Sequence, residues 1–294
     1  METFLEALVE GILYGGIYAL LALGLVIIYK SSQVFNIAHG EIMMFLAYFM
    51  VFLFSSHDLP LGLSFILVIL AGLAIGLACE RLFLRPLIGK PMLTTFMVCL
   101  IMGIFIRSIA ILWHGGTPQA ITLFRPVNLV IGNVSFFYPL VWSFSIALAM
   151  FVIFALFFRY TKIGLGMRCV AEDHQTSQSL GIDVKRVFAL SWAIGGAMAA
   201  IGGVLLGALT IVDSDTLGMF ALIRALPVLL LGGLESIPGA LVGGLLIGVS
   251  ETIASTYIDR YVEGFRELLP FILIVVILVI RPNGLFGLKK IERI

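Results

Sequence analysis

The sequence predicts an all-α membrane protein that crosses the bilayer about eight or nine times. Three observations support this prediction: the 294 residues have a mean hydropathy of +1.14, 61% of them are hydrophobic, and only 12% are charged. Soluble domains carry about 25% charged residues, so this composition excludes a water-soluble fold. The net charge of +1 by itself says nothing about nucleic-acid binding. We expect a lipid membrane as the surroundings and no nucleic-acid partner.

Nine apolar segments are candidates for membrane helices, since a span needs about 20 mostly apolar residues. The second, seventh and eighth are short or interrupted by glycine and proline, so residues 36–54 and 217–254 either cross the membrane fully or are re-entrant. We expect a single membrane domain over residues 1–294. The nine segments are 7–29, 36–54, 61–79, 92–113, 137–158, 188–211, 217–234, 237–254 and 267–281.

The basic residues predict the orientation, because cytoplasmic loops carry an excess of lysine and arginine. Segments 81–90, 159–186 and 281–293 hold 12 of the 18 basic residues and are therefore predicted to be cytoplasmic. The chain begins with acidic residues, and its first basic residue is Lys30. We expect the N-terminus outside and the C-terminus in the cytoplasm, with the first segment retained as a span because it lacks the features of a signal peptide.

Glycine pairs in the second half predict close helix packing. Small residues four positions apart lie on one helix face and let two backbones approach each other. Three such pairs occur at Gly203 and Gly207, at Gly239 and Gly243, and at Gly244 and Gly248.

Two polar stretches interrupt apolar surroundings, one in each half of the chain, at 35–41 and 231–239. Many transporters carry interrupted helices at matching positions of two repeats, with the helix ends directed at the transport pathway. We therefore expect an internal repeat and place these stretches at the pathway or at helix breaks. Their candidate residues are Asn36, His39, Glu41, Glu235, Ser236 and Pro238.

The roles of His39 and Glu41 stay open between alternatives. Ionisable groups inside a bilayer are costly and usually face a cavity or a partner. They either border the transport pathway, or form an internal hydrogen-bonded knot that satisfies a broken backbone. A proton relay is a third alternative.

Two arginines lie within apolar segments. Arg224 either attracts a substrate carboxylate or pairs with Glu235 or Glu251. Arg107 either extends to the membrane interface or marks a changed substrate preference.

One long polar loop, residues 159–187, separates two apolar segments on the basic side. A membrane protein has little need for such a loop unless another molecule docks there. The loop holds five of the basic residues, and we expect it to be a cytoplasmic coupling loop.

Five motifs resemble those of branched-chain amino acid ABC transporter permeases. Their order and the chain length are most similar to the shorter of the two permease subunits. The motifs are N-I-A-H-G-E at 36–41, E-R-L-F-L-R-P-L at 80–87, M-R-C-V-A-E-D at 167–173 followed by L-G-I at 180–182, G-G-L-E-S-I-P-G-A at 232–240, and R-P-N-G-L-F-G at 281–287.

The resemblance implies an assembly with a second homologous permease subunit, two cytoplasmic ATPase subunits and an extracytoplasmic substrate-binding protein. Residues 171–181 would form a short helix seated in the ATPase, although His174 replaces the usual proline. The sequence has no G-x-x-x-x-G-K-[ST] phosphate loop, so another chain must supply the energy. The coupling residues carried over from the family are Arg168, Ala171, Glu172, Asp173 and Gly181.

The resemblance implies import of branched-chain or other small amino acids across the cell inner membrane by alternating access. Permeases of this family for urea, short amides or aromatic acids are the alternative, and sugar or nucleoside permeases a further one. A self-sufficient secondary transporter would need paired intramembrane carboxylates, and these are scattered here. We expect no enzymatic activity, catalytic residue, cofactor or metal, since nothing has the required spacing.

Overall fold

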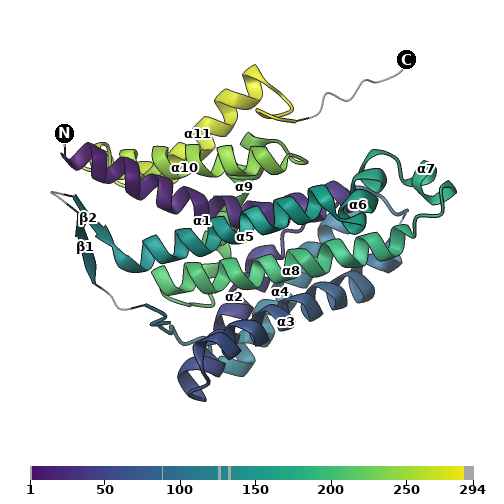
Figure 1. Ribbon diagram of the computed structural model, residues 1–294, viewed down its shortest axis with the longest axis horizontal. Coiled ribbons are helices and arrows are strands. Elements are labelled where there is room, and N and C mark those ends of the chain that lie inside the picture. The colour runs from purple at the N-terminus through teal and green to yellow at the C-terminus, as the bar shows by residue number, and fades with distance from the viewer. Residues whose placement is uncertain (1, 88, 125–126, 132–133, 288–294) are drawn as a thin grey trace.

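The computed structural model describes residues 2–87, 89–124, 127–131 and 134–287, which form an elongated helical bundle (Figure 1). Among the described residues, seven helical stretches are long and apolar enough to cross a membrane, and one further apolar helix is shorter. This confirms the prediction of an all-α polytopic membrane protein.

Each predicted apolar segment corresponds to a helix, and several helices extend further into polar sequence than the apolar runs do. Helices α2 and α3 continue as short π-helices, η1 (Val51–Ser56) and η2 (Glu80–Leu84), and a 3₁₀ turn η3 (Arg85–Leu87) follows the second. The nine helices are α1 (Glu2–Ser32), α2 (His39–Met50), α3 (Leu61–Cys79), α4 (Met92–His114), α5 (Tyr138–Tyr160), α8 (Val184–Leu209), α9 (Leu217–Gly232), α10 (Ile237–Tyr257) and α11 (Phe265–Ile280).

Helix α1 is the buried centre of the bundle and packs most closely on α10. A Cβ atom built on Gly244 would lie 2.6 Å from the carbonyl oxygen of Gly15, and one on Gly15 would lie 2.7 Å from that of Gly244. The Gly244 and Gly248 pair predicted to allow close packing does so here, because both residues face α1.

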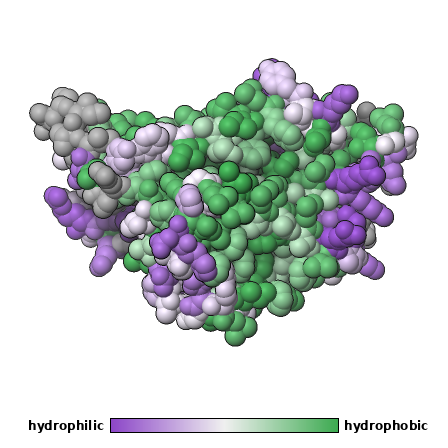
Figure 2. Space-filling view, turned by 60° about the horizontal axis from the view of Figure 1, so that its bottom comes forward, coloured by the Kyte–Doolittle hydropathy of each residue, from purple (hydrophilic) through white to green (hydrophobic). Residues whose placement is uncertain are grey.

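Helices α3, α4, α5 and α11 lie at the periphery and expose apolar side chains. Figure 2 shows a broad hydrophobic surface between two hydrophilic ends. Such a surface would be unfavourable in water and is typical of a protein surrounded by lipid. Exposed apolar residues of these peripheral helices include Ile66, Leu70, Ile101, Ile104, Phe105, Ile153, Val275 and Val279.

One end of the bundle carries the predicted cytoplasmic segments, and we call it the basic end. Here α6 (Lys162–Glu172) and α7 (His174–Ser179) connect α5 to α8 (Figure 1). Met167 and Val170 of α6 pack with Phe158, Val187 and Phe188 in a small separate core, which holds the loop against the bundle.

The other end carries a β-hairpin that the sequence analysis did not predict. Strand β1 (Asn128–Ile131) pairs antiparallel with β2 (Val134–Phe137), directly before α5. Its strands are only four residues long, too short for a hydrophobic period to stand out.

Candidate functional site

Helix α2 begins inside the bundle, and polar side chains lie at its start. After α1 the chain turns at Gln33, whose φ is 55°, and α2 starts at His39. Asn36 and His39 are each only 1% exposed. The His39 ring lies against Gly24 of α1 and interacts weakly with the Leu21 carbonyl.

Among the described residues, no hydrogen bond joins these groups to one another. Among the described residues, neither the Asn36 amide nor either ring nitrogen of His39 meets a partner in hydrogen-bond geometry. The Oε2 atom of Glu41 also has no partner there.

Glu41 lies where α2, α4 and α9 meet. A Cβ atom on Gly218, in the first turn of α9, would lie 2.9 Å from its Oε2 atom, and one on Gly103 of α4 would lie 3.4 Å from its Cγ atom. Glycine at both positions therefore leaves room for this carboxylate.

Arg107 lies near enough to act electrostatically on this carboxylate. It interacts electrostatically with Glu41 and forms an ion pair with Asp215, which precedes α9. Its side chain is 37% exposed and that of Asp215 is 71% exposed. The site therefore combines charges of both signs from α2, α4 and the start of α9.

Arg224 is held in a buried ion pair with Glu251. Its Nη2 atom lies 2.7 Å from Oε1 of Glu251, and the two side chains are 6% and 10% exposed. The centroid of the Phe220 ring lies 3.8 Å from the guanidinium carbon of Arg224. Of the two carboxylates that the sequence offered, Arg224 pairs with Glu251 and thereby joins α9 to α10.

Glu235 instead bonds the end of α1. The amide of Gln33 donates to its Oε1 atom at 3.0 Å, and Lys30 donates to its backbone carbonyl at 3.2 Å. The break that contains Glu235 is thereby fixed to the segment that leads into α2.

The break between α9 and α10 has local reasons in the sequence. Gly233 adopts a φ of 105°, which ends α9. The Ser236 hydroxyl accepts a hydrogen bond of 3.0 Å from the Gly239 amide, and Pro238 occupies the first turn, so α10 begins at once.

The closing motif of the chain packs onto this break. The amides of Leu285 and Phe286 donate to the carbonyls of Leu231 and Gly232 at 2.8 and 3.1 Å. Residues 281–287 thus cover the end of α9, where helix carbonyls need partners.

The expected coupling helix is shorter than the predicted 171–181. Ala171 and Glu172 end the preceding helix α6, because Asp173 adopts an extended conformation. Its carboxylate accepts a 3.0 Å bond from the Thr176 amide and caps α7. Gly181 follows with a φ of 84°.

The surface of this loop is open. Glu172, Asp173 and Gly181 are exposed, and Leu180 is 75% exposed. Arg168 is half-buried and donates to the backbone carbonyl of Arg159 at 3.1 Å, so it joins α6 to the end of α5.

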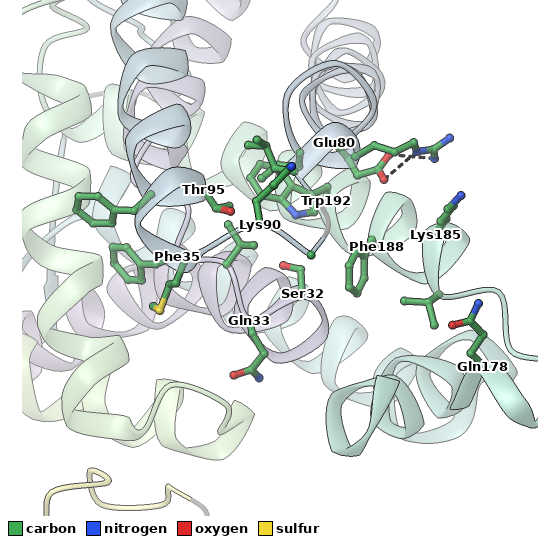
Figure 3. Close-up of a pocket in the computed structure, with 18 of the residues that line it drawn as sticks. Ser32, Gln33, Phe35, Glu80, Lys90, Thr95, Gln178, Lys185, Phe188 and Trp192 are labelled. Carbon is green, nitrogen blue, oxygen red and sulfur yellow. Dashed lines mark hydrogen bonds and ion pairs between the residues drawn. The ribbon is translucent and has the colours of Figure 1, made fainter. Parts of the chain in front are cut away.

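A cavity of about 830 Å³ opens at the basic end beside the coupling loop (Figure 3). Its wall includes Gln178 from the coupling loop and Phe35 from the segment before α2. The cavity therefore lies between the two regions that the sequence singled out.

Comparison with known proteins identifies the family. The model of the branched-chain amino acid transport system permease component matches residues 7–278. The chain belongs to this family. It is 30% identical over 99% of its length to the high-affinity branched-chain amino acid transport system permease protein LivH of Escherichia coli K12, with 98% of that protein covered. BraD of Pseudomonas aeruginosa, described in the same words, is 31% identical over 99% of this chain and 98% of its own.

A more distant relative of this permease is the nucleoside ABC transporter permease protein NupB of Lactococcus lactis. It is 30% identical over 54% of this chain and 47% of its own length. No solved structure matches the permease. The family match includes every candidate residue, and the permease places them in two groups, one at the start of α2 and one at the basic end.

Sequence reasoning about the permease missed Asp215 and Gln33. Asp213 caps the turn before α9 by accepting from the Thr216 amide at 3.1 Å, and this D-S-D-T pattern is a helix-start signal that could have drawn attention to Asp215. Gln33 follows an apolar helix as an ordinary polar residue, and only its contact with Glu235 distinguishes it.

Proposed function

We propose that this permease is the membrane subunit of an ATP-driven importer for branched-chain or other small amino acids. The observation that carries the proposal is the similarity to LivH and BraD over almost the whole length of both chains. Urea, short amides and aromatic acids are the alternative substrates.

The proposed pathway passes the start of α2. An amino acid carries an ammonium and a carboxylate, and Glu41 and Arg107 offer one charge of each sign from two different helices. The unpartnered polar groups of Asn36 and His39 lie further along the same segment. Such a broken helix at a charged site is typical of transporters.

The proposed coupling site is the loop 159–187 with α7. Its exposed residues lie at the basic end, which the charge rule assigns to the cytoplasm. Two ATPase subunits would dock there, and closure of these subunits would move α6 and α7 as a rigid body. Arg168 would pass this movement to α5 through the Arg159 carbonyl.

The remaining partners follow from the proposed orientation. The N-terminus and the β-hairpin would lie outside, where a substrate-binding protein delivers the amino acid. A second, homologous permease subunit would complete the pathway. Docking on the outer face and ATP-driven closure on the inner face would then bias the same two-state bundle.

Reconstitution tests the proposal. The permease, the second permease and the ATPases encoded beside it are placed in proteoliposomes, the binding protein is added outside, and uptake of labelled leucine, urea and benzoate is measured. We expect leucine uptake that requires both ATP and the binding protein. Uptake without ATPase subunits would favour a secondary transporter, and ATP-dependent uptake of urea or benzoate alone would replace the substrate assignment.

A further inference from the structure

The cavity at the basic end is built by five parts of the chain, one of which is α7 with Gln178. The other four are the end of α1 with the segment after it, the end of α3 with its connection to α4, the start of α4, and the start of α8 with the residues just before it. Figure 3 shows side chains from these parts around one space. Because the parts are far apart in the sequence, the cavity is a property of the packed bundle.

The interior of the cavity is mainly apolar. Aromatic rings from α4, from α8 and from the segment before α2 face it, together with aliphatic side chains. A cavity of this composition favours a ligand with a hydrocarbon part. The apolar lining residues used here are Phe35, Leu84, Phe96, Phe188 and Trp192.

The charged groups at the cavity leave two cations without a partner. Glu80 is bound by Arg85 through two hydrogen bonds of 3.2 and 3.1 Å, so this pair is neutral. Asp183 is paired with Arg186 at 2.9 Å. Lys90 and Lys185 also line the cavity, and within the described part of the chain no carboxylate pairs with either.

This charge pattern selects the class of ligand. Both carboxylates at the cavity are already paired, so a cation or a zwitterion finds no free negative group. Two free ammonium groups above an apolar interior suit an anion that carries a hydrocarbon chain. Basic pockets between helices at the cytoplasmic side of a membrane bind anionic lipid headgroups in this way.

The cavity also borders a surface suited to contact with lipid tails. Met92 lines the cavity and is itself 67% exposed, and the neighbouring Leu93 is 67% exposed. Leu82, in the turn before Leu84, is 67% exposed. Met92 therefore places an exposed apolar side chain at the edge of the cavity, where an acyl chain would enter.

We infer that this cavity binds one anionic phospholipid of the cytoplasmic leaflet. Its phosphate lies near Lys90 and Lys185, and an acyl chain lies among the aromatic side chains of the interior. The bound lipid joins the connection before α4 to the start of α8. It also contacts both the coupling loop, at Gln178, and the segment before α2, at Phe35.

The test measures lipid retention by native mass spectrometry on the full-length permease. Protein in nanodiscs of equal parts phosphatidylglycerol and phosphatidylcholine is released into detergent, and the retained lipids are counted. We expect one phosphatidylglycerol per chain in preference to phosphatidylcholine. Two lysines together correspond to about a thirtyfold preference, which the variant Lys90→Ala/Lys185→Ala should lose.

The matched control is Arg159→Ala/Lys162→Ala, which removes two exposed positive charges from the same end but outside the cavity. It should keep the preference. A second variant, Val184→Phe, fills the cavity without changing charge and should also reduce retention. A circular-dichroism melt shows that each variant is folded.

Three outcomes would overturn the inference. The first is equal retention of the two lipids by the wild type, and the second is equal loss in both double variants, which would indicate surface charge alone. The third is competition by glycerol 3-phosphate as strong as that by a short-chain phosphatidylglycerol, which would indicate an anion site without a lipid chain. The measurement needs neither ATP nor substrate, so its failure is distinct from failure of the proposed transport.

Discussion

The side-chain amide of Gln33 donates a 3.0 Å hydrogen bond to the carboxylate of Glu235, 202 residues further along the chain. This contact joins the two polar breaks of the bundle at its basic end. Lys30 strengthens it by donating to the Glu235 carbonyl. The segment that leads into α2 is therefore tied to the connection between α9 and α10.

Replacing Glu235 by alanine should destabilise the permease. A hydrogen bond to a charged group contributes about 1.5–3 kcal/mol, and the loss should lower the melting temperature of the purified chain in detergent. The control is Glu263→Ala, which removes an exposed carboxylate outside both breaks. Equal melting temperatures for both variants would show that the contact contributes nothing.

Breaking the ion pair of Arg224 should destabilise the permease more than the loss of the Glu235 contact does. Arg224→Met leaves Glu251 buried without a partner, which costs about 3–5 kcal/mol. The double variant Arg224→Met/Glu251→Leu removes both charges and should recover most of this stability. Unfolding in denaturant measures the free energy of unfolding of the single and the double variant. A double variant as unstable as the single one would contradict the ion-pair account.

Because α1 and α10 pack closely, a substitution at Gly244 should lower the stability of the permease. A Cβ atom there would lie 2.6 Å from the Gly15 carbonyl oxygen and 2.7 Å from Cβ of Ala19, so Gly244→Ala should destabilise by about 1–3 kcal/mol. Gly62→Ala in α3 is the control, because nothing lies within 4 Å of its added Cβ atom. An equal loss of thermal stability in both variants would show that the Gly15 contact is not the cause, since alanine alone favours a helix over glycine.

If the loop transmits movement from the ATPases, a substitution at Gly181 should change transport only when the ATPases are present. Its φ of 84° strains any other residue by about 1–2 kcal/mol, so Gly181→Val should distort the end of the coupling loop. We expect less substrate transported per ATP hydrolysed in proteoliposomes. Gly264→Val introduces the same backbone strain before α11, at a φ of 78°, and should keep the wild-type ratio. An unchanged ratio in Gly181→Val would argue against the coupling role.

The proposed pathway predicts that Glu41 matters for transport more than for stability. Glu41→Gln keeps the size of the side chain and removes its charge. Losing one charged contact of about 1.4 kcal/mol should lower uptake about tenfold. Uptake and melting temperature are measured together, with Glu267→Gln, an exposed carboxylate of α11, as control. Normal uptake in Glu41→Gln would remove this residue from the pathway.

Helix lengths and motifs could be predicted from the sequence, whereas contacts between polar side chains could not. Ser236, Pro238 and Gly181 act locally, as a cap, a first-turn residue and a positive-φ position, so their motifs predicted their places. The sequence could not decide whether Arg224 pairs with Glu235 or with Glu251. Both glutamates follow Arg224 in the chain, and no local sequence rule distinguishes them. Arg107 and Asp215 came together only through the packing of α4 beside the start of α9.

The sequence by itself determined that this chain is a polytopic helical membrane protein, where its spans lie, and which family it belongs to. The reason is that a bilayer demands apolar helices of fixed length and satisfied backbone groups, and both requirements are local. Only the tertiary structure decided which charges meet and where a cavity opens. Those features depend on how closely glycine-lined helices approach each other across long sequence separations, and no periodicity in the chain encodes that approach.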